Sequence, residues 1–368
     1  MAIRWIEGFE VAAHADTLPR IYSDVQVTGS VSTVVGRQGG RALNEEISLR
    51  TPALVGAASN TWTAGVEFYK NSTNALTATS PYLAFFNGTD EQIRCEIIPF
   101  VIPSAVRSVN GFKLAVKRGA TTLATSNEFW SYNGGPADYL YIEFSVVIAD
   151  GVGGSFSAQV STVAGAVDTT TVTWDSANTG IDTQEQVATG ADRCELGTGT
   201  NSPRLDNWYV SDDSTFQGPI YVQGYLPSAD GAATDWTLDG ASNIADAWAE
   251  TYAEGSVTED DKRVSSTVTS DEHLATVVSS DSGTDLIGDT SSVVAVKLDI
   301  HARMETAGDL DIGARWRQGG STVQSGSFNI SSTAMSVLSQ VEVQNPVTAS
   351  AWVGSEPRNL ELGVINNG

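Results

Sequence analysis

The sequence predicts an all-β chain built as two β-sandwich domains, with at most one or two short helices. The first observation is composition: 35 of the 368 residues are glycine, 17% are charged and 41% are hydrophobic, which is typical of β-rich proteins with many turns. The second is a succession of short apolar or alternating runs separated by turn residues. The third is length, because a chain of this size exceeds one ordinary domain.

Short runs with apolar residues at every second position fill the N-terminal part of the chain. In the run 61–69, for example, positions 62, 64, 66 and 68 are all apolar and share one face. The runs that we expect to be strands are 42–49, 61–69, 82–87, 93–100, 111–117, 121–125, 140–148 and 155–160. Because an isolated hairpin cannot bury its own apolar face, they predict two packed sheets, a sandwich of jelly-roll type.

The end of the first domain is expected near residue 222. Residues 204–210 and 220–226 have the pattern of strands. The cluster of proline, aspartate and glycine at 227–231 follows, and these residue types are typical of a linker. We therefore assign the first sandwich to 1–222 and a second, smaller one to 223–368.

The second domain is predicted to contain one helix and several strands. Residues 242–252 carry apolar side chains at helical spacing behind a serine and asparagine cap. The expected strands are 262–268, 274–278, 293–303, 309–318, 321–330, 336–343 and 360–364. This domain is the more acidic, because it holds 7 basic and 21 acidic residues, whereas the first holds 13 and 23. We expect this charge to lie in solvated loops.

The net charge of −24 excludes binding to nucleic acid through a basic surface. No window approaches the roughly eighteen consecutive apolar residues of a membrane-spanning helix, and the opening residues lack the apolar stretch of a signal peptide. We expect a soluble chain made in the cytoplasm. The two cysteines, Cys95 and Cys194, are far apart in the sequence and are expected to be buried thiols rather than a disulfide or a zinc site.

Groups for catalysis are scarce in the sequence. The three histidines, His14, His273 and His301, have no second histidine at metal-ligand spacing. Motifs of serine hydrolases, zinc peptidases and P-loop enzymes are absent. A glycosidase would need two carboxylates about 5 Å apart on one strand face, but strands 140–148 and 93–100 offer only the single residues Glu143 and Glu96. A lone strand carboxylate is usually outward and solvated, so we expect no enzymatic activity, no catalytic residue, no metal and no cofactor.

Sugar binding needs fewer groups than catalysis. Aromatic rings can stack on a pyranose while asparagine hydrogen-bonds its hydroxyl groups. The candidate glycan-binding residues are Trp130, Tyr132, Asn133, Trp208 and Tyr209. The alternative for the two tryptophans is packing in the core or at the edge of the sandwich.

A calcium ion is a further alternative. Asp206, Asp212 and Asp213 could supply the several oxygen ligands that hard cations prefer. The helix-flanked pattern of twelve residues that marks a common class of calcium loop is missing.

Several short motifs occur in order along the chain, at 3–10, 36–43, 62–68, 139–144, 154–156, 204–210, 216–222, 226–231, 235–237, 345–352 and 360–364. Together they resemble virion proteins of tailed bacteriophages that carry an N-terminal jelly roll like those of concanavalin A or laminin G (LamG). The resemblance covers most of the chain as scattered motifs.

This resemblance implies a non-enzymatic structural protein on the phage particle, made in the bacterial host cytoplasm and present in many copies. It carries no catalytic residues to transfer. We favour a tail fibre or tail tip, because a jelly roll with aromatic turn residues suits contact with a host glycan. A capsid decoration or head-fibre protein is the alternative, and a carbohydrate-binding module or glycosidase-like domain is the second. The expected partners are other virion proteins, further copies of the chain and a host cell-surface glycan, without nucleic acid or membrane insertion.

Overall fold

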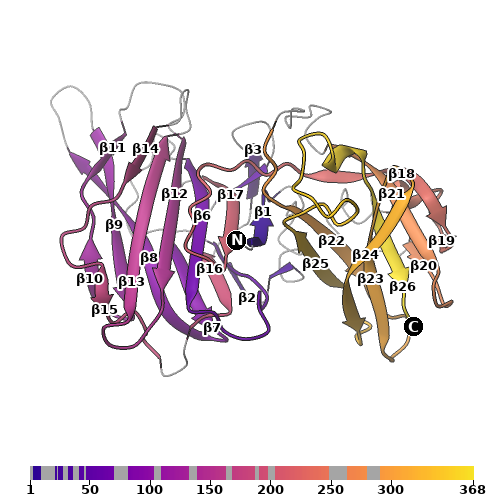
Figure 1. Cartoon of the computed structure of the whole chain (residues 1–368), viewed down its shortest axis with the longest axis horizontal. Coiled ribbons are helices and arrows are strands. Elements are labelled where there is room, and N and C mark those ends of the chain that lie inside the picture. The colour runs from indigo at the N-terminus through magenta and orange to yellow at the C-terminus, as the bar shows by residue number, and fades with distance from the viewer. Residues whose placement is uncertain are drawn as a thin grey trace. The chain divides into compact units, whose positions relative to one another are not determined.

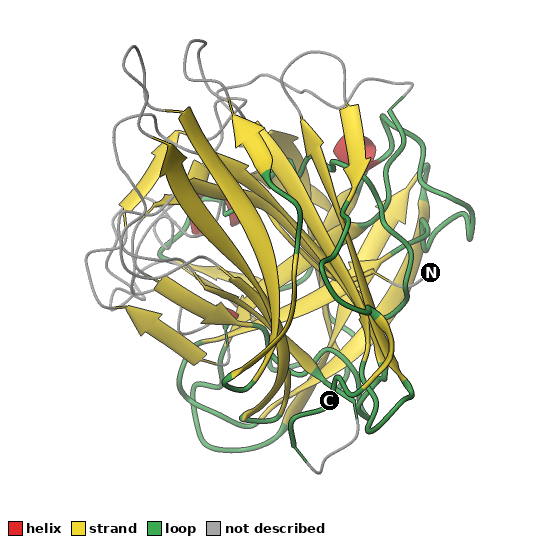
Figure 2. Ribbon diagram, turned by 90° about the vertical axis from the view of Figure 1, so that its left-hand side faces the viewer, coloured by secondary structure: helices red, strands yellow, loops and turns green. Residues whose placement is uncertain are grey.

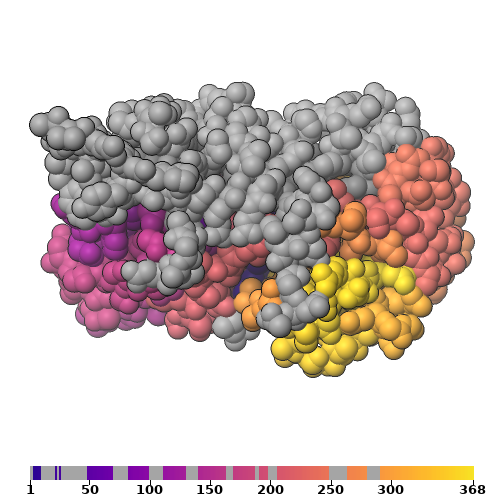
Figure 3. Space-filling model, turned by 90° about the horizontal axis from the view of Figure 1, so that it is seen from above, coloured from indigo at the N-terminus to yellow at the C-terminus, as the bar shows by residue number. Residues whose placement is uncertain are grey.

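The computed structural model is nearly all β, with 60% of the residues in strands and 3% in helices (Figures 1 and 2). This confirms the predicted fold class. The structure describes residues 3–9, 21–22, 24–27, 32–35, 41–44, 47–69, 82–102, 109–131, 139–162, 168–186, 190–197, 204–247, 263–279 and 291–368. The chain divides into two compact units, Met1–Phe9 with Tyr22–Val222 and Glu10–Ile21 with Gln223–Gly368. Figure 3 shows the described surface of the C-terminal residues in orange and yellow.

The first unit contains a nine-stranded antiparallel sheet. Its order is β14-β13-β12-β6-β17-β4-β3, with β1 also paired to β17 and β15 to β13. The strands are β1 (Ile3–Glu7), β3 (Ser32–Val35), β4 (Arg41–Asn44), β6 (Thr61–Tyr69), β12 (Tyr139–Val147), β13 (Gly154–Thr162), β14 (Asp168–Thr171), β15 (Thr179–Ile181) and β17 (Arg204–Ser211).

An eight-stranded antiparallel sheet forms the other layer of the first unit. Its order is β10-β9-β8-β7-β16-β5-β2, with β11 also paired to β9. The strands are β2 (Asp24–Val27), β5 (Ile47–Arg50), β7 (Tyr82–Asn87), β8 (Asp90–Ile102), β9 (Val109–Arg118), β10 (Thr121–Thr125), β11 (Phe129–Ser131) and β16 (Arg193–Gly197).

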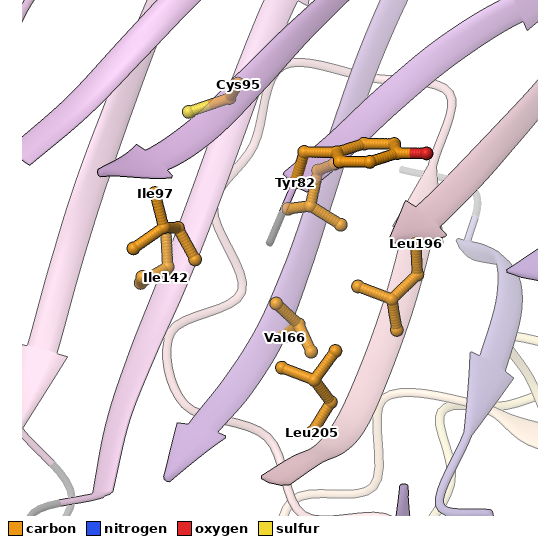
Figure 4. Close-up of a pocket in the computed structure, with 8 residues that line it drawn as sticks. Val66, Tyr82, Cys95, Ile97, Ile142, Leu196 and Leu205 are labelled. Atoms are coloured by element: carbon orange, nitrogen blue, oxygen red, sulfur yellow. The ribbon is translucent and has the colours of Figure 1, made fainter. Parts of the chain in front are cut away.

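The two sheets pack face to face through alternating apolar side chains, as a sandwich requires. Phe85 of β7 stacks on Trp62 of β6 at 6.0 Å and on Phe144 of β12 at 6.2 Å between ring centroids. A small apolar cavity remains between the layers, where Val66 and Leu205 of one sheet face Leu196 of the other (Figure 4). Its volume of about 10 Å³ is at the lower limit for one water molecule, so it is a packing defect rather than a ligand site.

The predicted strand 42–49 is wrong as a single element, because it is two strands of different sheets. β4 pairs with β3 and β17 in the nine-stranded sheet, whereas β5 pairs with β2 and β16 in the eight-stranded one. The chain therefore crosses between layers within a few residues. Local apolar alternation does not report such a crossing, because it is a property of each strand and does not specify the strands that it pairs with.

The second unit is built on a five-stranded antiparallel sheet of order β18-β21-β26-β23-β24, faced by the two-stranded sheet of β22 and β25. Ile300 of β22 packs in one cluster with Ile312 of β23 and Ile330 of β24. Trp316, Trp352 and Leu360 form a second cluster. Further elements are the β19-β20 pair and a short 3-10 helix, η1. The bounds are β18 (Tyr225–Thr234), β19 (Thr237–Asp239), β20 (Arg263–Ser265), β21 (Glu272–Ser279), β22 (Val296–Ala302), β23 (Leu310–Gln318), β24 (Ser321–Ile330), β25 (Ser336–Glu342), η1 (Pro357–Asn359) and β26 (Glu361–Asn366).

The cluster 227–231, predicted to be a linker, lies within strand β18 instead. Pro227 is tolerated there because β18 is an edge strand, and the pairing register shifts next to this residue. The strand predicted at 220–226 begins only at Tyr225. The predicted helix starts as expected: residues 244–247 are helical, and Asn243 Oδ1 accepts a hydrogen bond from the backbone N–H of Asp246. The remainder of 242–252 lies outside the described residues.

Candidate functional site

Two of the five predicted glycan-binding residues are in the interior. Trp208 and Tyr209 are both 0% exposed. Trp208 stacks on Tyr22 at 6.2 Å between ring centroids, and Tyr209 on Tyr141 at 6.5 Å. A ring without exposed surface cannot stack on a sugar, so the structure corrects the prediction for these two residues. Trp208 and Tyr209 therefore contribute to the interior packing of the first unit.

Of the other three predicted residues, the structure describes only Trp130, which lies in β11. Trp130 pairs with Gly111 of β9 across the edge of the eight-stranded sheet. Tyr132 and Asn133 lie outside the described residues. Among the described residues, no shared site joins Trp130 to the buried rings of Trp208 and Tyr209.

Glu143 is a buried hydrogen-bond acceptor rather than a solvated strand carboxylate. It projects from β12 on the outer face of the nine-stranded sheet, the face directed away from the eight-stranded sheet, and is 0% exposed. Its Oε1 accepts hydrogen bonds from the hydroxyl of Tyr209 at 2.5 Å and from the backbone N–H groups of Gln217 at 2.7 Å and Gly218 at 3.0 Å. Its Oε2 accepts a bond from the amide of Gln159.

A second buried side chain, that of Asn207, binds the same segment that follows β17. Asn207 donates from its side-chain amide to Glu67 Oε2 at 2.8 Å and accepts the backbone N–H of Val222 at 2.8 Å. Thr63 donates to the carbonyl of Asp213 at 2.6 Å. Residues 213–222, named here the covering segment, are thus fastened across the outer face of the sheet.

The aromatic groups under the covering segment are fixed in their neutral form. Burial raises the pKa of Tyr209 above its ordinary value, and the adjacent Glu143 carboxylate raises it further. Burial also raises the pKa of Tyr141, whose hydroxyl donates to the carbonyl of Asn207 at 2.9 Å. Gly65 lies beneath both rings, and a Cβ there would overlap Tyr209. This arrangement holds the covering segment against the sheet.

The outer face of the eight-stranded sheet carries a line of charged residues, named here the charged row: Arg50, Glu195, Arg94 and Lys117. These residues are aligned across β5, β16, β8 and β9 by the strand register, with Ala84 of β7 in the middle. Arg50 and Glu195 form a buried ion pair at 2.6 Å. Arg94 and Lys117 keep 28% and 26% of their side chains exposed.

Two further side chains complete this face. Glu96 bridges the basic groups, with its carboxylate 2.8 Å from Arg94 Nε and 2.5 Å from Lys117 Nζ. Tyr82 donates its hydroxyl to Glu195 at 2.6 Å, and burial together with Glu195 raises the pKa of this phenol. The partly exposed guanidinium and ammonium groups can donate hydrogen bonds to hydroxyl or carboxylate oxygens of a saccharide. Arg94, Glu96 and Lys117 occupy outward positions of predicted strands, and this alternation was the signal that could have located the face.

The three aspartates considered for calcium are engaged elsewhere. Asp206 accepts the backbone N–H of Asn207, Asp212 pairs with Arg4 at 2.6 Å, and Asp213 accepts the backbone N–H of Thr215. Among the residues that the structure describes, no group of three or more histidine, cysteine, aspartate or glutamate side chains could hold a metal.

The histidines and cysteines are dispersed. His273 of β21 is 2% exposed and lies 3.4 Å from Asp230, His301 lies in β22, and His14 is outside the described residues. Cys95 and Cys194 are free and buried, and burial raises the pKa of both thiols. This confirms the prediction of buried thiols. Within the described ranges no helix is long and apolar enough to cross a membrane.

No family model and no curated protein matches this chain. Among solved structures it is similar to the PL-14 alginate lyase from Aplysia kurodai, with a TM-score of 0.37, 9% identity and coverage of 57% of this chain and 99% of that chain. It is similar to the endo-β-1,4-glucuronan lyase from Trichoderma reesei, with a TM-score of 0.33, 12% identity and coverage of 59% and 98%. Lectin I-B4 from Griffonia simplicifolia has a TM-score of 0.26, 12% identity and coverage of 51% and 90%. With TM-scores this low, the description of the fold rests on the strand pairing alone.

Proposed function

We propose that this chain is a non-enzymatic structural protein on the surface of a tailed-phage virion, with a tail fibre or tail tip as its favoured position. The support for the virion is the ordered set of motifs that resembles phage particle proteins with an N-terminal concanavalin A-like or LamG-like jelly roll. A capsid decoration or head-fibre protein is the alternative. In each case the chain acts beside other virion proteins and as several copies of itself, because phage particles are built by symmetry.

The observation that carries the non-enzymatic part is the engagement of the candidate carboxylates. Glu143 accepts four hydrogen bonds from its own chain, and Glu96 is bridged by Arg94 and Lys117. A glycosidase acid or nucleophile must reach the glycosidic bond, whereas Glu143 lies under the covering segment. Assays for reducing ends released from bacterial polysaccharides should therefore give no turnover. Release that is lost in Glu143→Gln or Glu96→Gln would favour the glycosidase-like alternative instead.

A glycan-adhesive role belongs to the same proposal, and the charged row is the described surface that favours it. Many weak sites on one particle convert marginal affinity into avidity. Binding of the purified chain to host surface polysaccharide should weaken when Arg94 and Lys117 are both changed to glutamine. Lys113→Gln is a matched control, because Lys113 is 36% exposed and pairs with Glu128 away from the row.

Mass spectrometry of purified particles tests the virion proposal. The chain should be present, and its absence from particles that are otherwise complete would overturn the proposal. Copy number then separates the two positions. Hundreds of copies per particle would place the chain on the capsid, and a few to a few dozen would place it on a tail appendage.

A further inference from the structure

Open strand edges are the feature of this fold that most readily pairs with another chain, and most of them are protected here. An edge strand presents unpaired N–H and C=O groups, and proteins limit this hazard with short strands, charges, prolines or bulges. In the first unit, the strands at the described sheet edges have five residues or fewer. They are β1, β2, β3, β10, β11, β14 and β15.

The long edges of the second unit are protected by sequence. β18 has ten residues, but it carries Pro227 and its pairing register shifts twice. β22 and β25 have seven residues each, with Lys297 and Asp299 in the first and Glu342 in the second. Charges and proline on such edges disfavour pairing with a further strand.

β24 is the least protected of the long edges. It has ten residues, Ser321–Ile330, without a charged residue or a proline, and it forms the end of the five-stranded sheet next to β23 (Figure 1). Within the described part of the chain, its backbone makes no main-chain hydrogen bond other than those to β23. Gln324 and Ser327 are exposed. One bulge interrupts the strand, where Gly326 has φ +70°.

The net charge of the chain restricts the surfaces through which two copies can meet. Each copy carries −24 overall, and residues 223–368 hold 7 basic and 21 acidic side chains. Two copies repel each other wherever these charges meet, so they associate best through an uncharged surface. β24 is such a surface, and a strand that pairs antiparallel with its own copy satisfies a twofold axis.

We propose that β24 pairs antiparallel with β24 of a second copy and joins two five-stranded sheets into one. The inference rests on the copies of the chain that the proposed function requires, and it names the interface between them. With full overlap of the two strands, Gln324 of one copy lies opposite the partner's Ser327, and Ser327 opposite the partner's Gln324. Introduced charges at these two positions would therefore face each other across the axis.

Sedimentation velocity of the full chain over a concentration series tests the proposal. The wild type should dimerise, and the double variant Gln324→Glu with Ser327→Glu should bind itself at least tenfold more weakly, because four carboxylates then meet at the axis. Ala229→Glu on exposed β18 is the matched control and should dimerise like the wild type. Unchanged thermal unfolding of each variant, measured by circular dichroism, establishes that each is folded.

A charge-exchange experiment distinguishes repulsion between the introduced carboxylates from structural damage to β24. The double variant Gln324→Lys with Ser327→Lys should associate with the glutamate variant, since opposite charges then face each other. The proposal would be overturned if the wild type is monomeric or if the glutamate variant dimerises as strongly as the wild type. It would also be overturned if Ala229→Glu weakens the dimer as much as the glutamate variant does, or if the mixture of the lysine and glutamate variants stays monomeric. None of these results affects the virion proposal, which is tested separately by the content of purified particles.

Discussion

Glu143 shows how one buried carboxylate organises the first unit. It accepts three hydrogen bonds on Oε1 and one on Oε2, and two of the donors are adjacent backbone N–H groups at Gln217 and Gly218. Gly218 has φ +74°, a left-handed conformation that favours glycine and lets successive N–H groups converge on one oxygen. Glu143, a candidate catalytic acid by residue type, therefore has a structural role, because its carboxylate holds the covering segment against the sheet.

Removing the acceptor should cost more than neutralising it. We expect Glu143→Ala to lower the free energy of unfolding by about 3–5 kcal/mol, because buried donors lose their partner. Glu143→Gln should cost only about 1 kcal/mol, because its amide oxygen still serves Oε1 donors and Gln159 can rotate to accept. Urea unfolding measures both. Glu128→Ala, whose side chain is 42% exposed, is the control and should stay within about 0.5 kcal/mol of the wild type; equal losses for Ala and Gln at 143 would contradict this account.

The buried phenols predict a loss of stability at alkaline pH. Burial raises the pKa of Tyr82, Tyr141 and Tyr209 above the ordinary value. Since the folded state favours the neutral phenol, this contribution is fully present below the unfolded tyrosine pKa of about 10. It is lost as pH rises from there through the higher folded values.

Ultraviolet titration of phenolate absorbance should find these three tyrosines silent in the folded protein at pH values where they ionise in urea. Replacing Tyr82 by phenylalanine should leave the titration of the folded protein unchanged and remove one titrating tyrosine from the titration in urea. If all tyrosines titrate together near the ordinary pKa in the folded chain, the burial argument is wrong.

At the scale of elements, tight turns depend on individual glycines. The hairpin between β23 and β24 turns at Gly319 and Gly320, which have φ +56° and +89°. A side chain in this conformation is strained. The turn brings β24 back against β23, so β24 is the end strand of the five-stranded sheet in the described part of the chain.

Gly319→Ala should lower the free energy of unfolding by about 1 kcal/mol, measured by thermal or urea unfolding. Gly56→Ala is a matched control, since a Cβ at either position meets nothing within 4 Å and only Gly319 has a positive φ. The control should be neutral or slightly stabilising, because alanine restricts the unfolded chain. Equal effects at both positions would argue against conformational strain as the cause.

At the scale of the whole molecule, the covering segment completes the first unit. The division of the chain falls between Val222 and Gln223, directly after the residue whose backbone N–H Asn207 accepts. Residues 213–222 form no strand, yet they supply the donors for Glu143 and Asn207. A boundary placed at the end of the last strand would therefore remove part of the folded unit.

A fragment of residues 1–222 should be more stable than one of residues 1–212, although both contain every strand of the first unit. The shorter fragment lacks the N–H groups of Gln217, Gly218 and Val222 and exposes the outer face of the nine-stranded sheet. Each buried polar group left without its partner costs about 1–3 kcal/mol. Differential scanning calorimetry of the two fragments makes the comparison, and equal melting temperatures would show that the covering segment contributes nothing.

The sequence by itself determined the all-β class, most strands and the absence of familiar catalytic motifs. Strands such as β6, β7, β10 and β24 have the predicted bounds, because alternation of apolar residues is a local property of a half-buried strand. The burial of Cys95 and Cys194 was expected because unpaired cysteines are among the most buried residue types.

Only the tertiary structure decided which polar and aromatic residues face solvent. A sugar site uses residue types such as those of Trp208, Tyr209 and Glu143, but here the covering segment and the neighbouring rings bury these side chains. The charged row likewise required the order β5-β16-β7-β8-β9, which joins residues more than one hundred positions apart. The exposure of side chains and the order of strands depend on how distant segments pack together, so the local sequence pattern does not determine either of them.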